Sequence, residues 1–322
     1  MLGEDRMCYS AEVWADYHKY VRAYGADIDI DAFVELYLRR AADPKIKIPK
    51  GMDQGFLHTQ TPGVTEIQAL IQSYNATFVQ NSEQELFKQA KRLADAERVL
   101  AGSKPTKKAA NDQRIAGKKV KQLKRWISDG IRTVPVPERD DRIFPDWYAP
   151  VLIVEDGRPI VRPMRYHCRP AGMDPSIDRT KRGQVSGTYN ARRDNLTRFW
   201  RHQFGHTHGL MVARVFYENV DDGAGGSQEL QFIPSTGENL LIACLVSHWT
   251  DPAGLLPDLW SYAAVTDAPE PEVAAAGHDR TIVNLKPENV DAWLTPQGRS
   301  VEELLALMDD KQHPYYEHRK AA

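Results

Sequence analysis

The stretch VLIVEDGRPIVRPM, residues 151–164, decides the class of fold. Apolar residues dominate both of its arms, and Asp156-Gly157 stands at its centre. An Asp-Gly pair between two apolar runs is typical of a β-hairpin with a two-residue turn, because both residues tolerate a positive φ. The sequence therefore predicts an antiparallel hairpin here, with a β-rich body around it.

Strand-like and helical patterns flank this hairpin. From Val134 onward we expect further strands, over 134–137, 209–217, 230–233, 240–246 and 260–269, with DGAGGS (222–227) as a turn. The spacing of apolar residues predicts a short strand and two helices within 8–42, helices over Thr65–Tyr74, Ser82–Leu100 and Lys107–Ile127, and short helices at 288–294 and 300–309. A β-rich body with helices at its ends indicates an α+β fold.

A basic segment stands near the front of a nearly neutral chain. The 322 residues carry a net charge of −2, yet the stretch from Lys88 to Arg125 contains thirteen Lys and Arg against three acids. Such an excess suits nucleic-acid phosphates, although a run of charge is also typical of a solvated helical face. We interpret residues 45–130 as a basic helical insertion in a single domain over 8–322. The candidate phosphate ligands are Lys118, Lys119, Lys121, Lys124 and Arg125.

The composition excludes several classes of protein. No stretch approaches ~18 apolar residues, so neither a transmembrane helix nor a membrane partner is expected. The N-terminal sequence MLGEDRMCYS has no apolar core and does not resemble a secretory signal. Three widely spaced cysteines without a CxxC pair indicate a reducing compartment, which favours a cytoplasmic location.

Two places in the first two thirds of the chain carry residues suited to chemistry. Cys8 follows Met7, and a cysteine at a chain terminus offers a thiol and an α-amine, with ordinary pKa values near ~8.5 and ~8. Asn190 and Arg192 are two apart on a predicted strand and share a face, which suits a phosphate or a carboxylate. The structural alternatives are a small buried cysteine and a polar strand end.

Two further candidates lie downstream. Glu218 closes an apolar strand, and a carboxylate buried there would have a raised pKa suited to proton transfer. His278 precedes another strand beside Asp279 and Arg280, whose charges can set its protonation state. An exposed strand end and a surface turn are the structural alternatives.

Metal and cofactor signatures are absent from the sequence. His202, His206 and His208 stand close together, but no carboxylate or cysteine lies at a metal-ligand spacing and HExxH is missing. The nucleotide loops GxGxxG and GxxxxGK[ST] and the hydrolase motif GxSxG are also missing. We therefore expect neither a metal nor a cofactor.

The order of the four places is more specific than any one of them. The segments are MCYS (7–10), WYAP (147–150), NARRDN (190–195), VFYE (215–218) and GHDRTIVNLKPENVDAWL (277–294). Taken together, this order resembles the SOS-response-associated peptidase (SRAP) family, also called abasic-site processing proteins. The matches are scattered over 7–24 and 143–294, roughly half of the chain.

The chain also departs from the family pattern. The family's Met-Cys-Gly-Arg is MCYS here, so Tyr9 and Ser10 replace a glycine and a phosphate-binding arginine. Its Asn-Ala-Arg-x-Glu-Thr is NARRDN, and the Pro that follows His-x-Arg is lost. Its Trp-Gly-x-x-Pro wedge has no counterpart, and PMRYHCRP (163–170) stands in its place. These departures concern DNA binding more than chemistry.

The resemblance implies a fold of curved antiparallel sheets and a covalent reaction with abasic sites in single-stranded DNA. The amine of Cys8 would form a Schiff base with the sugar aldehyde, and its thiol would then close a thiazolidine ring. Glu218 would shuttle protons, and His278 would protonate the ring oxygen of the sugar. Asn190 would orient the terminus.

For DNA contacts, the resemblance implies Arg192 on a flanking phosphate, together with Pro150 and Arg280. The chemistry also requires a free amine on Cys8, so residues 1–7 would be a leader that is removed, through self-cleavage or through translation from Met7. Two other classes of function stay open. One is a cysteine N-terminal-nucleophile hydrolase of peptides or amides, and the other is a nucleic-acid-binding module without catalysis.

Overall fold

The computed structural model describes residues 10–221 and 226–321, and it divides into two compact units. The larger unit holds the chain up to Gln60 and from Val136 onward, and the smaller unit is Thr61–Pro135. Cys8 and most of the expected turn at 222–227 lie outside the described residues. The two units are treated separately below.

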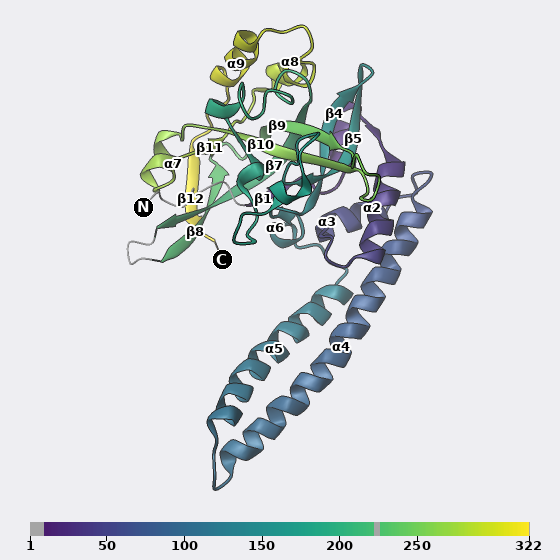
Figure 1. Ribbon diagram of the computed structural model, residues 1–322, viewed down its shortest axis with the longest axis vertical. Coiled ribbons are helices and arrows are strands. Elements are labelled where there is room, and N and C mark those ends of the chain that lie inside the picture. The colour runs from purple at the N-terminus through teal and green to yellow at the C-terminus, as the bar shows by residue number, and fades with distance from the viewer. Residues whose placement is uncertain (1–9, 222–225, 322) are drawn as a thin grey trace. The chain divides into compact units, whose positions relative to one another are not determined.

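Strands dominate the larger unit, and the α+β class is confirmed (Figure 1). Its strands are β1 (Ser10–Val13), β2 (Asp27–Ile28), β3 (Arg142–Ile143), β4 (Tyr148–Glu155), β5 (Arg158–Tyr166), β6 (Asn190–Arg192), β7 (His208–Asp221), β8 (Ser227–Pro234), β9 (Leu240–Trp249), β10 (Leu259–Asp267), β11 (Thr281–Ile282) and β12 (Tyr316–Lys320). Its helices are α1 (His18–Tyr24), α2 (Ile30–Ala42), α3 (Lys50–Leu57), α6 (Pro137–Asp140), α7 (Pro271–Ala275), α8 (Val290–Leu294) and α9 (Val301–Asp309), with 3-10 turns at 175–178, 187–189, 193–195 and 287–289. The expected hairpin is β4–β5.

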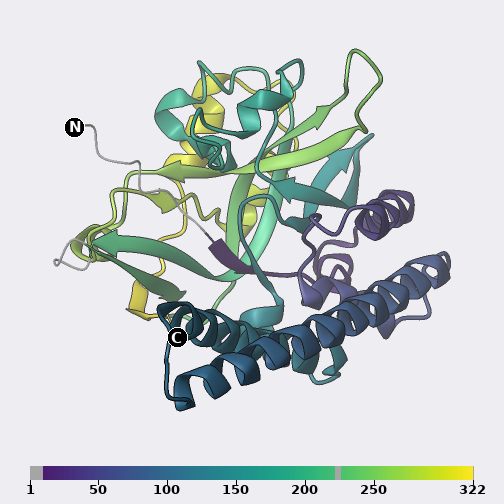
Figure 2. The same ribbon diagram turned by 60° about the horizontal axis from the view of Figure 1, so that its bottom comes forward.

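Five strands of this unit close into a ring. Antiparallel β4 and β5 are joined to β10, which runs parallel to β5, then to β9 and β7, and β7 returns to β4 through Leu152 and Leu210. Figure 2 shows the strong curvature of these strands. The interior is tight, because a Cβ on Gly209 would come within 2.7 Å of a Val246 methyl group. Closure of this kind removes free strand edges and fixes where each strand ends.

The first strand lies inside the sheet rather than at its border. Ser10 pairs with Tyr217 of β7, and Ala11 pairs with Ile143 of β3 on the other side. All four residues of β1 are buried. The first described strand is therefore held between β3 and the middle of the long strand β7.

Most elements expected in this unit are present, with one correction. The strand and the two helices within 8–42 are confirmed as β1, α1 and α2, and the C-terminal helices as α8 and α9. Val134–Pro137 was expected to be a strand, and this is wrong. Pro137 instead occupies the first position of α6, where its missing N–H costs no hydrogen bond.

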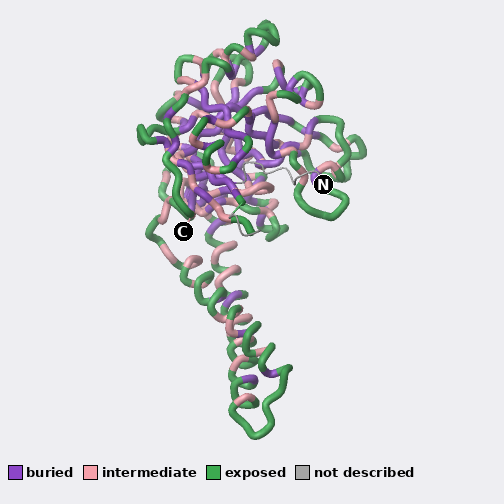
Figure 3. The backbone as a smooth tube through the Cα atoms, turned by 90° about the vertical axis from the view of Figure 1, so that its left-hand side faces the viewer, coloured by how far each residue is buried: buried purple, intermediate pink, exposed green. Residues whose placement is uncertain are grey.

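The smaller unit is a hairpin of two long helices, α4 (Thr65–Ala101) and α5 (Lys107–Ile131). The expectation of two helices over 65–74 and 82–100 is wrong, because α4 is continuous. Residues 75–81 contain neither Gly nor Pro, and Phe78 packs against Trp126 of α5 with ring centroids 6.1 Å apart. Thr106 caps α5 by accepting from the Ala109 N–H. Most of the hairpin surface is exposed or half-buried (Figure 3).

Candidate active site

Glu218 and His278 meet in the interior of the larger unit. Glu218 lies near the end of β7 opposite Leu230 of β8, and His278 follows α7 in a turn that Gly277 enters with φ +94°. The His278 Nε2 atom is 3.1 Å from Glu218 Oε2, and both side chains have no solvent exposure. Two of the four predicted catalytic residues are thus in direct contact, although sixty residues separate them in the sequence.

A hydrogen bond indicates which ring nitrogen of His278 carries a hydrogen. Nδ1 of His278 is 2.8 Å from the carbonyl oxygen of Arg280, which can only accept, so Nδ1 carries a hydrogen. Burial alone would lower the pKa of His278, but the hydrogen bond and negative charge of Glu218 outweigh burial and raise it above its ordinary value. The Nε2 atom therefore lies next to a carboxylate, an arrangement suited to proton transfer.

Asn190 and Arg192 lie on β6, beside the C-terminal part of β10. Asn190 pairs with Ala264 and is buried, and Arg192 pairs with Thr266 and shares its face of the strand. The Arg192 guanidinium donates to both carboxylate oxygens of Asp194, at 3.0 and 2.7 Å. An acidic side chain thus occupies the position that a phosphate was expected to take.

Arg280 and Pro150, two of the expected DNA contacts, are both buried. The Nη2 atom of Arg280 is 3.5 Å from Asp279, and its charge reaches Asp194, whose pKa is lowered chiefly by Arg192 and to a smaller extent by Arg280. Pro150 lies within β4 opposite Pro163 and offers no open surface. Arg280 therefore acts on this region through its charge, which lowers the pKa of Asp194, and through its carbonyl oxygen, which bonds His278 Nδ1.

The structure adds a polar cluster next to β1 that sequence reasoning missed. Buried Glu12 accepts from the Tyr217 hydroxyl and lies 3.5 Å from Arg214, while burial raises its pKa. Arg142 donates to the Ser10 hydroxyl at 2.8 Å and covers the Tyr217 ring at 3.7 Å. The only signal in the sequence is the acid inside the apolar run SAEV, residues 10–13. This cluster anchors the strand that leads back toward the chain start.

The two cysteines in the described part of the chain are unsuited to nucleophilic chemistry. Cys168 and Cys244 are both buried and free. Burial raises the pKa of Cys168 to about 12, and it raises that of Cys244 as well. A thiol with such a pKa has almost no thiolate at neutral pH. Of the three cysteines in the sequence, these two are therefore inert.

The histidine cluster at 202–208 has a structural role. His208 accepts from the Gly205 N–H at 2.9 Å, bonds the Trp293 carbonyl at 2.9 Å and stacks on the Trp293 ring with centroids 4.0 Å apart. Burial lowers its pKa to about 3. No group of three His, Cys, Asp or Glu side chains within 10–221 and 226–321 is placed to hold a metal ion. His208 therefore fastens α8 onto β7.

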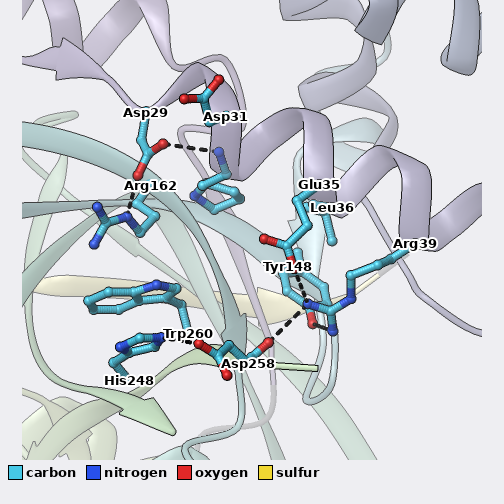
Figure 4. A pocket seen from close by; sticks show the side chains of 12 residues that line it. Asp29, Asp31, Glu35, Leu36, Arg39, Tyr148, Arg162, His248, Asp258 and Trp260 are labelled. Atoms are coloured by element: carbon cyan, nitrogen blue, oxygen red, sulfur yellow. Dashed lines mark hydrogen bonds and ion pairs between the residues drawn. The ribbon is translucent and has the colours of Figure 1, made fainter. Parts of the chain in front are cut away.

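A separate pocket of about 290 Å³ lies between α2 and the sheet of the larger unit (Figure 4). Trp260 is stacked on His248 with centroids 4.3 Å apart, and Arg162 lies 4.2 Å from the same ring. Arg162 also pairs with Asp29 at 2.6 Å. None of the predicted catalytic residues lines this pocket. Its two arginines, Arg162 and Arg39, both pair with carboxylates that also line it. We assign it to the packing of α2 against the sheet.

The fold and the buried pair define an α+β protein with an internal acid–base site. A family model described as SOS response associated peptidase (SRAP) matches residues 114–320. The match covers more than half of the chain, so the chain belongs to the SRAP family, whose name implies a peptidase-like activity. The resemblance seen in the sequence is confirmed. In the described residues, no helix is long and apolar enough to cross a membrane.

Solved structures provide a weaker comparison. A protein from Bordetella bronchiseptica is 19% identical, with a TM-score of 0.46 over 59% of this chain and 89% of its own. A phage-related protein from the same organism is 19% identical, with a TM-score of 0.43 over 59% and 84%. A protein from Bacteroides thetaiotaomicron is 15% identical, with a TM-score of 0.43 over 54% and 74%. No curated protein matches the chain.

Proposed function

We propose that this protein captures abasic sites in single-stranded DNA as a covalent thiazolidine formed by Cys8. The observation that carries the proposal is the buried Glu218–His278 contact beside the strand that leads to the chain start. Ser10 pairs with Tyr217, the neighbour of Glu218. The proposed reaction requires Cys8 to reach this carboxylate across the two residues that separate it from Ser10, a span of at most about 7 Å.

The reaction balances with groups that the chain supplies. The Cys8 amine adds to the aldehyde of the opened sugar, and loss of one water gives an imine. The thiol then adds to the imine carbon, and its proton passes to nitrogen, which closes the five-membered ring. Glu218 carries protons between these atoms, and the protonated His278 donates to the ring oxygen of the sugar during opening. The second step is intramolecular and gains from proximity.

The same site suits the exposure of the nucleophile. While Met7 precedes Cys8, the nitrogen of Cys8 is an amide whose lone pair is delocalised, so it cannot form an imine. Attack of the thiol on the Met7 carbonyl releases the amine and leaves a thioester, which water then hydrolyses. The family name favours this self-cleavage. The competing function from the same residues is hydrolysis of peptides or amides other than its own leader.

A gel shift under denaturing conditions tests the proposal. Processed protein should form a heat-stable adduct with a single strand carrying one abasic site, and no adduct with the intact strand. Cys8→Ala should abolish the adduct, whereas Cys168→Ala should leave it unchanged, because Cys168 is buried with a raised pKa. A stable adduct from Cys8→Ala would exclude the thiazolidine. Cleavage of added peptides without any adduct would favour the hydrolase.

A further inference from the structure

The outward face of α5 in the smaller unit carries an unbroken row of cations. The row, here called the basic stripe, consists of Lys107, Arg114, Lys118, Lys121 and Arg125. All five residues are exposed, and the side chain of Arg125 is 70% exposed. The polar residue Asn111 fills the remaining place in the row and accepts from Arg114 at 2.9 Å. No apolar or acidic side chain interrupts it.

The heptad spacing of the buried residues explains why these cations line up. Ala109, Ala116 and Leu123 are seven residues apart and form the buried side of α5 against α4. Each stripe residue stands two positions before or after one of them, which is about 200° around a helix of 3.6 residues per turn. The stripe therefore lies opposite the interhelical seam. It runs for about 27 Å with a cation roughly every turn, since each residue adds about 1.5 Å.

Acids on α5 stay clear of the stripe over most of its length. Asp112 faces the seam and pairs with Arg92 of α4 at 2.5 Å. Asp129 lies beyond the last stripe residue, 4.0 Å from Arg125. Beside the stripe, a groove of about 490 Å³ is lined by Arg92, Arg114, Lys118 and Lys119, with Ile115 and two glutamines and no carboxylate. Cations therefore predominate along this face from Lys107 to Lys121, and the nearest acid, Asp129, lies at the Arg125 end.

We propose that the basic stripe binds the sugar-phosphate backbone of a nucleic-acid strand along the length of α5. A regular line of charge suits a polymer with one negative charge per residue. A membrane surface fits less well, because amphipathic membrane helices need a broad apolar face beside their cations, and the groove beside the stripe contains one apolar residue, Ile115. The inference deepens the proposed function, on whose ligand it rests, but it needs neither Cys8 nor an abasic site.

The structure also divides the lysines that the sequence grouped together. Lys118, Lys121 and Arg125 belong to the stripe. Lys124 follows buried Leu123 directly and so points about 100° from the seam. Lys119 is turned toward the groove, where its ammonium lies 4.8 Å from the Trp126 ring and 3.1 Å from Gln122. We therefore expect the position of each cation on α5, as well as the total charge, to determine the affinity for nucleic acid.

Two triple variants of the full chain test this. The stripe variant is Lys107→Gln, Lys118→Gln and Lys121→Gln, and the control, with the same loss of charge, is Lys88→Gln, Lys91→Gln and Lys104→Gln. Anisotropy of a labelled 20-residue thymidine strand is measured between 50 and 300 mM salt. The stripe variant should bind at least about tenfold more weakly and lose about 2 from its log–log salt slope, at ~0.7 per phosphate contact. The control should stay within about threefold of wild type.

Several outcomes separate this inference from its rivals. Equal weakening in both variants would overturn it, and so would competition by polyglutamate as strong as that by the strand, which would indicate an acidic protein partner. A duplex arm distinguishes double from single strands. Glutamine is a good helix former, so circular dichroism should be unchanged in both variants. Cys8→Ala should bind the intact strand normally, so a failed crosslink would not affect this result.

Discussion

Nε2 of His278 lies 3.1 Å from Oε2 of Glu218, and solvent reaches neither side chain. Burial disfavours a charged imidazole, but the hydrogen bond and the negative charge of Glu218 outweigh burial and raise the pKa of His278. The imidazole is also anchored through Nδ1 to the Arg280 carbonyl, so it cannot turn away. The pair can hold one mobile proton next to the start of β1.

Replacing Glu218 should therefore change both the rate of adduct formation and the protonation of His278. Glu218→Gln keeps the shape but removes the proton carrier, and adduct formation should slow by about 10²–10⁴-fold. The pKa of His278 should also fall below its ordinary value, because burial remains without the carboxylate. Histidine NMR titration and quenched crosslinking assays measure the two effects, with exposed Glu302→Gln as control. Wild-type values for both would leave the pair with a structural role only.

The same contact predicts how stability depends on pH. The folded pKa of His278 is raised, so the folded state holds this proton more tightly than the unfolded chain does. Its contribution is complete below the ordinary pKa of about 6.5 and is lost as pH rises through the raised value. In urea titrations, the difference in unfolding free energy between wild type and His278→Gln should therefore become smaller as pH rises through this value. A difference that grows would contradict the charged pair.

Asp194 should act as a built-in competitor for phosphate at Arg192. Both of its oxygens accept from that guanidinium, at 3.0 and 2.7 Å. The Asp194 side chain is 63% exposed, so the pair is worth little and a phosphate can displace it. Asp194→Asn should raise the affinity for a short single strand by about two- to tenfold, whereas Arg192→Gln should lower it. Unchanged affinity in both variants would remove Arg192 from the DNA-binding surface.

The mature protein should begin at Cys8. Intact-mass measurement of the expressed chain should show loss of Met1–Met7, and the processed fraction should match the fraction able to form the adduct. If the protein cuts itself, Cys8→Ala and Glu218→Gln should retain the leader. Translation from Met7 would instead leave only one residue for an aminopeptidase. A full-length mass together with thiazolidine formation would contradict the mechanism, because an acylated nitrogen cannot form the imine.

A structural carboxylate away from this pair provides a separate test of the fold. Burial alone would raise the pKa of Asp146, but hydrogen bonds from His167 and Arg179, at 2.7 and 2.8 Å, outweigh it and lower the pKa to about 2. The gain in stability is present above the ordinary 3.8 and is lost as pH falls toward 2. Asp146→Asn should cost about 2 kcal/mol at pH 7. Asparagine tolerates the φ of 73° at this position, so the backbone stays unstrained, and the change removes the charge together with one of the two accepted hydrogen bonds.

Local sequence patterns predicted the hairpin and most strands, because a period of two and an Asp-Gly turn are properties of neighbouring residues. The pattern failed where the decisive contact was distant. Helix α4 was expected to be interrupted between Tyr74 and Ser82, but Phe78 in that interval packs against Trp126 of α5, a contact with no local sequence signal. The parallel pairing of β5 with β10 joins residues about a hundred positions apart and left no local trace.

For the site, the sequence supplied the residues but not their burial. Glu218 and His278 were predicted separately, and only the fold brings them into contact. Arg192 was expected to be available for phosphate, yet its acidic partner stands just two residues away in the sequence. Glu12 was missed because an acid in the apolar run SAEV has no meaning until β1 is placed between β7 and β3.

The position of β1 between β3 and β7 determines when the first strand can pair during synthesis of the chain. Tyr217 follows its partner Glu12 by 205 residues, so β1 cannot pair with β7 until most of the chain has been synthesised, although β3 becomes available earlier. At about 5–20 residues per second, this interval lasts roughly 10–40 s. The contact between Glu218 and His278 forms later still, because His278 follows Tyr217 by a further 61 residues. The reactivity proposed for Cys8 would thus arise only once most of the chain has been synthesised.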